Sequence, residues 1–277
     1  MRWLAPLLLV LAGALLMSQI VDRFVTYLIF QPTRGVDLTP GQLGVEGEEV
    51  FLDTEDDVRI HGFYLPDATG RADPPRAILF LHGNAGNASH RLPNAAELAR
   101  LGSDVLLLDY RGYGRSEGAP SEEGVYADAR AGLAHLLGTR GIPESRVVLF
   151  GRSLGGAVAV DLARGRKLAG VILESTFTNV RDIAGTLAGP PGRWLAGDAF
   201  DSQSKIAELR APLLFFHGDR DRIIAPRLGR RLYEAAPEPR AFETIPGAGH
   251  NDTVQKGGRP YFERIGRFLD EVAPVAP

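Results

Sequence analysis

The residues best able to do covalent chemistry lie in a short glycine-bounded segment, where residues 151–155 read G-R-S-L-G. The apolar, β-branched run 147–150 predicts a buried strand before it, and the small and apolar residues of 156–164 predict a helix after it. A sharp turn between strand and helix lifts the Ser153 hydroxyl out of the sheet and aims helix N-terminal amides at it. Ser153 is therefore a candidate nucleophile for a reaction that creates an oxyanion. The alternative is a glycine-bounded turn that happens to hold a serine.

A serine hydroxyl is a poor nucleophile near neutral pH and needs a base beside it. His250 is the predicted base, because small residues at 247–249 precede it in a loop after the last predicted strand and allow close approach. The remaining histidines are interpreted as structural, in strands, in helices or at turns: His61, His82, His90, His135 and His217.

A carboxylate must orient the histidine and stabilise its imidazolium form. Asp219 and Asp221 both follow the predicted strand 213–216, so the residues alone leave two candidates. The aspartate that does not serve this role is expected to form hydrogen bonds within the turn. With either one, the chain order is Ser, Asp, His, which is the order expected with a G-x-S-x-G motif.

Two preorganised N–H donors are needed to hold the oxyanion, and each contributes about 10²–10³ in rate. The amide of Leu154, next to the nucleophile, is the first predicted donor. The second is expected in the loop that follows the strand 77–81, and we predict the amide of Asn84, with Ala85 as the neighbouring alternative.

The elements that must position these residues alternate along the chain. A hairpin, 48–54 and 58–65, precedes further strands and helices. Predicted strands are 77–81, 105–108, 147–150, 171–173, 213–216 and 241–245, and predicted helices are 91–101, 122–137, 153–164, 227–236 and 261–272. This order predicts an α/β fold with a mostly parallel eight-stranded sheet, helices on both faces and an antiparallel edge hairpin. Ligands are then expected at the C-terminal ends of the strands.

Composition narrows the function classes. The chain has 277 residues with net charge −3, which suits one α/β domain and does not favour a nucleic-acid partner. Cysteine is absent, which excludes disulfides, thiolate metal sites and a cysteine nucleophile. The glycine-rich segment 109–116 lacks the lysine-serine ending of a P-loop, so it is interpreted as a structural turn with Arg111 paired internally. We predict no metal and no cofactor.

The N-terminal segment is apolar. Residues 3–21 carry no charge, and a helix of this length spans about 28 Å, near the thickness of a hydrocarbon core. We predict a single-pass membrane anchor over residues 1–30 and a linker over 31–47. The side of the membrane stays open because arginines lie on both flanks. A cleaved signal peptide, giving a secreted protein, is the alternative, but no small-x-small cleavage site follows Leu16.

The interval 175–210 is too short for a full lid domain and predicts a short cap of one or two helices over an open cleft. Phe177 and Trp194 are predicted to line a groove for an acyl chain, with Leu195 and Phe200 as further candidates. The alternative for each is packing of the cap against the domain. Glu174 and Ser175 are interpreted as structural hydrogen-bonding residues.

Five segments together resemble the α/β-hydrolase superfamily: HGNAGN at 82–87, DYRGYGRSEG at 109–118, GRSLGG at 151–156, HGDRD at 217–221 and GAGHND at 247–252. Within it, the chain is most similar to membrane-anchored α/β-hydrolase-domain proteins whose members remove acyl groups from lipids or palmitoylated proteins. The resemblance covers residues 45 to the C-terminus and implies an α/β-hydrolase domain at 48–277. It also implies Asp221 as the acid, because the acid stands three residues after the HG pair.

The resemblance implies a serine hydrolase that cleaves carboxylic ester or thioester bonds of lipid-like or acyl substrates through an acyl-enzyme. A serine peptidase of the same fold is the alternative, because the same three side chains can protonate a leaving amine. A non-enzymatic, membrane-anchored scaffold is the alternative from another class. The fold hosts many reactions, so the substrate does not follow from it.

Overall fold

The computed structural model describes residues 26, 29–70 and 73–275. The predicted anchor, residues 1–30, lies almost entirely outside this range. No helix within the described range is both long and apolar enough to span a membrane. Residues 32–277 form one compact unit.

The centre of this unit is an eight-stranded sheet with strand order β10-β9-β8-β7-β4-β6-β3-β2. Its strands are β2 (Glu48–Asp53), β3 (Arg59–Leu65), β4 (Ala77–Leu81), β6 (Asp104–Leu108), β7 (Val147–Arg152), β8 (Gly170–Glu174), β9 (Leu213–Gly218) and β10 (Arg240–Ile245). All neighbours are parallel except β2 with β3 and β3 with β6. The predicted mostly parallel sheet with an edge hairpin is confirmed. A separate two-stranded ladder joins β1 (Gln31–Pro32) to β5 (Ala85–Gly86).

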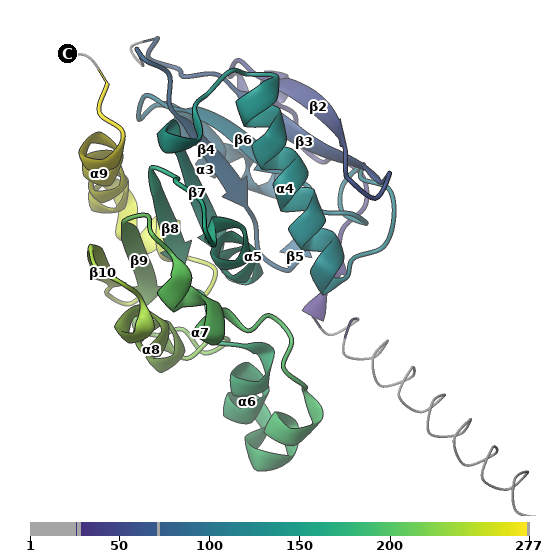
Figure 1. Cartoon of the computed structure of the whole chain (residues 1–277), viewed down its shortest axis with the longest axis vertical. Helices are drawn as coiled ribbons and strands as arrows, with labels where there is room; N and C mark the ends of the chain where they lie inside the picture. Colours follow the sequence, from purple (N-terminus) through teal and green to yellow (C-terminus); the bar gives the residue numbers. More distant parts are fainter. Residues whose placement is uncertain (1–25, 27–28, 71–72, 276–277) are drawn as a thin grey trace, which may run out of the picture. The chain divides into compact units, whose positions relative to one another are not determined.

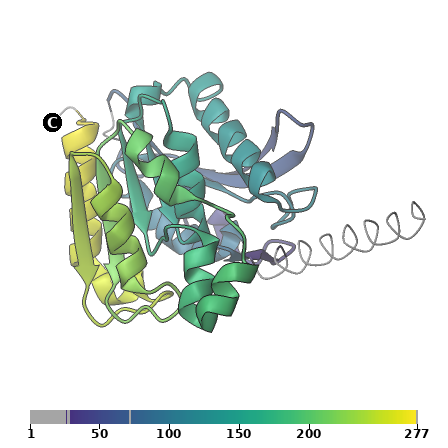
Figure 2. The ribbon, with the colours of Figure 1, turned by 60° about the horizontal axis from the view of Figure 1, so that its bottom comes forward.

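Helices cover both faces of the sheet, as predicted (Figures 1 and 2). One face carries α4 (Glu122–Gly138), α5 (Leu154–Ala163) and α8 (Pro226–Ala235), and the other carries α3 (Leu92–Ala99) and α9 (Thr253–Val272). Short helices α2 (Pro40–Leu43), η1 (Ala88–Arg91) and η2 (Glu144–Arg146) lie in the connections. The central strands are buried on both sides, which explains their continuous apolar runs, such as A-I-L-F-L in β4.

Two stretches predicted as irregular hold helix. The last helix begins at Thr253, eight residues before the predicted start at Tyr261. Gly258, at φ +52° and ψ −142°, is not helical and lies just before Pro260, so α9 consists of two helical segments that meet at a kink. The predicted linker 31–47 contains α2, whose N-terminus is capped by Thr39 with Gln42 in a reciprocal capping box.

The interval predicted as a short cap contains α6 (Val180–Leu195), α7 (Ser202–Lys205) and η3 (Ile206–Glu208). Asn179 caps α6 by accepting from the Asp182 amide at 2.7 Å. Gly189 adopts φ +65° and divides α6 into two halves ahead of Pro190 and Pro191. Figure 1 shows α6 beyond the strand ends, on the side toward which the arrow of β4 points.

Candidate active site

Three neighbouring loops at the C-terminal edge of the sheet bring Ser153, Asp221 and His250 together. Ser153 follows β7, Asp221 follows β9 and His250 follows β10. The His250 Nε2 atom lies 3.0 Å from Ser153 Oγ, and its Nδ1 atom lies 2.7 Å from Asp221 Oδ2. All three residues are buried, at 7%, 5% and 9% exposure respectively. The result is a continuous hydrogen-bonded chain from hydroxyl to imidazole to carboxylate.

Ser153 sits in a strained turn. Its backbone angles, φ +53° and ψ −116°, lie outside the regions that residues other than glycine normally adopt. Such a conformation costs about 1–3 kcal/mol. The surroundings hold this conformation, because the Ser153 amide donates to the Glu174 carbonyl at 2.8 Å. Gly155 permits the close packing: a β-carbon there would lie 1.9 Å from the Leu81 carbonyl oxygen. The second glycine of the motif is thus required by contact with the end of β4.

The Asp221 carboxylate is prepared as a hydrogen-bond acceptor. Oδ1 accepts from the amides of Ile223 and Ile224 at 2.9 and 2.8 Å, while Oδ2 faces His250 and lies 3.4 Å from His217 Nε2. Burial raises the pKa of this carboxyl, but the hydrogen bonds from His217 and His250 outweigh burial and hold the pKa well below its usual range. An ionised Asp221 can only accept, so the proton on His250 is at Nδ1 and Nε2 is free to accept from Ser153.

Asp219 has a different environment from Asp221. It is exposed, and its Oδ1 accepts from the Gly247 amide at 2.7 Å, which ties the turn after β9 to the loop that carries His250. Of the two aspartates that the sequence left open, the one in contact with His250 is Asp221.

The two predicted donor amides belong to two segments that meet at the Ser153 turn, namely the start of α5 and the segment after β4. Strands β4 and β7 are adjacent, with Leu81 paired to Gly151, so the segment after β4 lies against the Ser153 turn. A β-carbon on Gly83 would lie 3.4 Å from Ser153 Cβ. Within the described chain, neither the Asn84 amide nor the Leu154 amide donates a hydrogen bond. Both amides therefore keep a donor that is not used within the described chain. Ala85, the alternative, is in β5.

A buried ion pair that the sequence did not predict supports the histidine loop. Arg152 Nη2 donates to the His250 carbonyl at 2.9 Å, and Arg152 Nε lies 3.2 Å from Glu174 Oε1. Glu174, fully buried, also accepts from Thr253 Oγ1 and from the Tyr261 hydroxyl. These contacts fasten the loop after β10 to the ends of β7 and β8. The predicted structural role of Glu174 is confirmed, but its partner was not identified.

The two aromatic residues predicted to line a groove differ in their exposure to solvent. Phe177 is 2% exposed and Trp194 is 83% exposed. Phe200 is also buried and packs edge-on against Tyr126, with ring centroids 5.8 Å apart. The contact of Phe200 corresponds to the packing alternative, whereas Trp194 is free to meet another molecule.

The glycine-rich segment at 109–116 makes internal contacts. Arg111 pairs with Asp128 at 2.9 Å and with Asp56 at 2.6 Å, as the predicted internal pairing requires. Among the described residues, no cluster of three or more histidine or acidic side chains could hold a metal ion.

The chain is similar in sequence to a family of hydrolases and to α/β hydrolase domain proteins. A family model described as "Serine aminopeptidase, S33" matches residues 72–197. The α/β hydrolase domain-containing protein WAV2 of Arabidopsis thaliana is 36% identical, covering 96% of this chain and 92% of that protein. Protein bem46 of Schizosaccharomyces pombe is 32% identical, covering 84% and 80%.

Among solved structures, an esterase of Pyrococcus furiosus has a TM-score of 0.74, covering 88% of this chain and 98% of that one. At 22% identity this likeness concerns the fold alone. The identity to WAV2 and bem46 extends over most of both chains. The chain is a member of the α/β-hydrolase family, related to the WAV2 and bem46 proteins.

Proposed function

We propose that the protein is a serine hydrolase that cleaves carboxylic ester or thioester bonds of lipid-like or acyl substrates. The observation that carries the proposal is the hydrogen-bonded chain Ser153–His250–Asp221, with distances of 3.0 and 2.7 Å, at a strained turn between a strand and a helix. Ser153 is the nucleophile, His250 the base, and Asp221 the group that orients and stabilises the imidazolium.

In the acylation step, Ser153 Oγ attacks the carbonyl carbon as its proton passes to His250 Nε2. The carbonyl oxygen becomes an oxyanion that accepts from the amides of Asn84 and Leu154. The tetrahedral intermediate collapses as His250 Nε2–H protonates the departing alkoxide or thiolate. This leaves the acyl group on Ser153 Oγ and the alcohol or thiol free.

In the deacylation step, His250 Nε2 takes a proton from water while the water oxygen attacks the acyl carbon. The same two amides hold the second oxyanion. Collapse returns the proton to Ser153 Oγ and releases the carboxylic acid. Asp221, ionised throughout because its pKa is held below the usual range, stabilises the imidazolium in both steps.

The proposal of an acyl substrate is supported by the cap. Leu187 is 63% exposed and Trp194 is 83% exposed, so α6 presents apolar side chains to solvent beyond the strand ends. A peptidase activity is the second candidate, because the matching family model is described as a serine aminopeptidase. Peptide hydrolysis needs the same three side chains and differs in the leaving amine.

We expect the purified protein to hydrolyse p-nitrophenyl acyl esters faster than p-nitroanilides of single amino acids with a free amino group. Rates on short, medium and long acyl esters locate the preferred chain length. The Ser153→Ala variant serves as the background for each substrate. Faster Ser153-dependent cleavage of the anilides would reject the esterase in favour of the peptidase.

We propose further that the apolar segment 3–21 anchors the protein in a membrane, which would keep the catalytic domain near lipid-like substrates. After cell lysis, the full-length protein is expected in the membrane pellet, released by detergent but retained in high salt. A mature N-terminus beyond Ser18, detected by terminal sequencing in a membrane-free extract, would contradict the anchor.

A further inference from the structure

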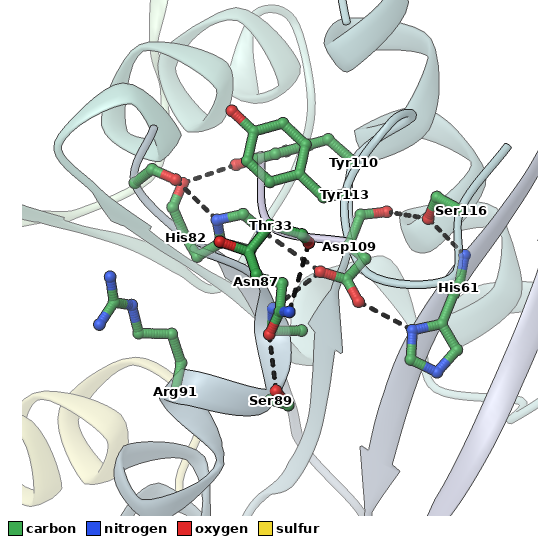
Figure 3. A network of polar contacts seen from close by, with 12 residues as sticks. Thr33, His61, His82, Asn87, Ser89, Arg91, Asp109, Tyr110, Tyr113 and Ser116 are labelled. Carbon is green, nitrogen blue, oxygen red and sulfur yellow. Dashed lines mark hydrogen bonds and ion pairs between the residues drawn. The ribbon is translucent and has the colours of Figure 1, made fainter. Parts of the chain in front are cut away.

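A second buried polar network lies directly behind the segment that carries the Asn84 amide. Its centre is Asp109, the residue after β6, which has no exposed surface. Figure 3 shows the Asp109 carboxylate between His61 and the turn that begins η1. One oxygen accepts from His61 Nδ1 at 2.8 Å and the other from the Ala88 amide at 2.7 Å. The catalytic steps described above use none of these groups.

The network forms hydrogen bonds with the segment 82–88 at several points. The Tyr110 hydroxyl donates to the His82 carbonyl at 3.0 Å, and the Tyr113 hydroxyl donates to the Asn84 carbonyl at 2.6 Å. With the bond from the Ala88 amide to Asp109, three groups from the loop after β6 hold both ends and the middle of the segment. Both tyrosines are fully buried, so water does not compete for the hydrogen bonds of their hydroxyl groups.

The direction of the Asn84 amide follows from these contacts. Its N–H belongs to the peptide group that also contains the Gly83 carbonyl, and that carbonyl accepts from His82 Nδ1 at 2.7 Å. In a trans peptide the N–H points opposite to the carbonyl, away from the His82 ring. The next peptide plane is held by the Tyr113 hydroxyl. With the planes on both sides of Asn84 fixed, its amide has one available direction.

The negative charge of Asp109 strengthens this arrangement. Burial raises the pKa of the carboxyl, but the hydrogen bond from His61 and the nearby His82 ring, with Nε2 3.6 Å from Asp109 Oδ1, outweigh burial and hold the pKa below its usual range. The loop closes tightly on the carboxylate, since a β-carbon on Gly114, at φ +51°, would lie 2.0 Å from Asp109 Oδ2. The D-Y-R-G-Y-G sequence at 109–114 therefore supplies both the three groups that hydrogen-bond to the segment 82–88 and the turn that positions them.

We propose that Asp109, Tyr110 and Tyr113 are positioning residues that preset the Asn84 amide toward the oxyanion formed at Ser153. This inference rests on the proposed function. Loss of a complete oxyanion donor costs about 10²–10³ in rate, so loosening one is expected to cost part of that. The loss should fall on kcat, because the amide bonds the transition state more strongly than the bound ester.

The test compares Tyr113→Phe with Tyr64→Phe in the full chain. Each variant removes one hydroxyl from a buried tyrosine, and the Tyr64 hydroxyl donates to Asp104 Oδ2, away from the 82–88 segment. With the best ester of the panel, Tyr113→Phe is expected to lower kcat about 10-fold with KM unchanged, and Tyr64→Phe less than 2-fold. Affinity for an alkyl boronic acid, whose adduct places an oxygen at the oxyanion position, should fall in parallel with kcat.

Asp109→Asn is the second variant, expected to lower kcat about 10²-fold, and thermal unfolding identifies any loss of folded protein. Equal kcat and equal boronic acid affinity in Tyr113→Phe and Tyr64→Phe would overturn the inference. Failure of the proposed function has a separate signature, namely no Ser153-dependent turnover by the wild-type protein.

Discussion

Ser153→Ala is expected to lower kcat for ester hydrolysis by about 10⁵–10⁶-fold while the protein stays folded. The Ser153 hydroxyl oxygen is the atom that attacks, and His250 Nε2 lies 3.0 Å from it, in position to take its proton. His250→Ala should reduce kcat by a similar factor, because a hydroxyl without a base is a weak nucleophile. The double variant should be little worse than either single one, since the two residues act as a unit.

Ser175→Ala is a matched control for Ser153→Ala. Ser175 also follows a central strand, also has a positive φ, of 48°, and is fully buried, but its Oγ has no hydrogen-bond partner in the structure. Its kcat should stay within about 3-fold of wild type, because no reacting atom contacts it. A loss in Ser175→Ala comparable with that in Ser153→Ala would show that the measurement reports damage to the strand ends.

A glycine at position 153 should relieve the backbone strain and raise the stability of the folded protein. Ser153→Gly removes the side chain that makes φ +53° unfavourable, so this variant is expected to melt at a higher temperature than Ser153→Ala. Both variants should be equally inactive. The activity loss would then be separated from any loss of folded protein.

Asp221→Asn is expected to lower kcat by about 10⁴-fold, a smaller loss than that of the Ser153 or His250 variants. An asparagine can keep one oxygen on the Ile223 and Ile224 amides, at the positions that Asp221 Oδ1 now binds. Its NH₂ group then faces His250 Nδ1, which must become an acceptor. The proton moves to Nε2, and His250 can no longer accept from Ser153. The wrong tautomer explains why geometry can be retained while turnover is lost.

Asp219→Asn is the control for this change, two residues away in the same turn. Its oxygen can still accept from the Gly247 amide, and the site is exposed, so kcat is expected to fall less than about 3-fold. The comparison is made at neutral pH on purified variants with matched thermal unfolding. A severe loss in Asp219→Asn together with a mild loss in Asp221→Asn would contradict the assignment of the acid.

The sequence predicted the sheet well because its local signals are strong. The apolar runs of β4 and β7 and the hairpin of β2 and β3 were placed within one or two residues of their observed bounds. The predicted helix 261–272 corresponds to the second segment of α9, after the kink at Gly258, and the short helical segment that begins at Thr253 was not predicted. Short helices are stabilised by tertiary packing, of which local propensity gives no account.

The site was predicted unevenly. The G-x-S-x-G segment marks Ser153 by local pattern alone, but the choice of Asp221 over Asp219 needed the family resemblance. Arg152 pairs with Glu174, which is 22 positions away in the sequence. The Tyr113 hydroxyl donates to the carbonyl of Asn84, which is 29 positions away. Neither has a signature in a single sequence, because each depends on strands that become neighbours only in the folded sheet.

Covalent labelling by a fluorophosphonate probe tests the central claim most directly, because only an activated serine attacks phosphorus at a useful rate. The folded wild-type protein should gain one probe group, and mass spectrometry should locate it on the peptide that contains Ser153. Ser153→Ala should remain unlabelled. A folded wild-type protein that stays unlabelled, or that carries the probe on another residue, would contradict the account.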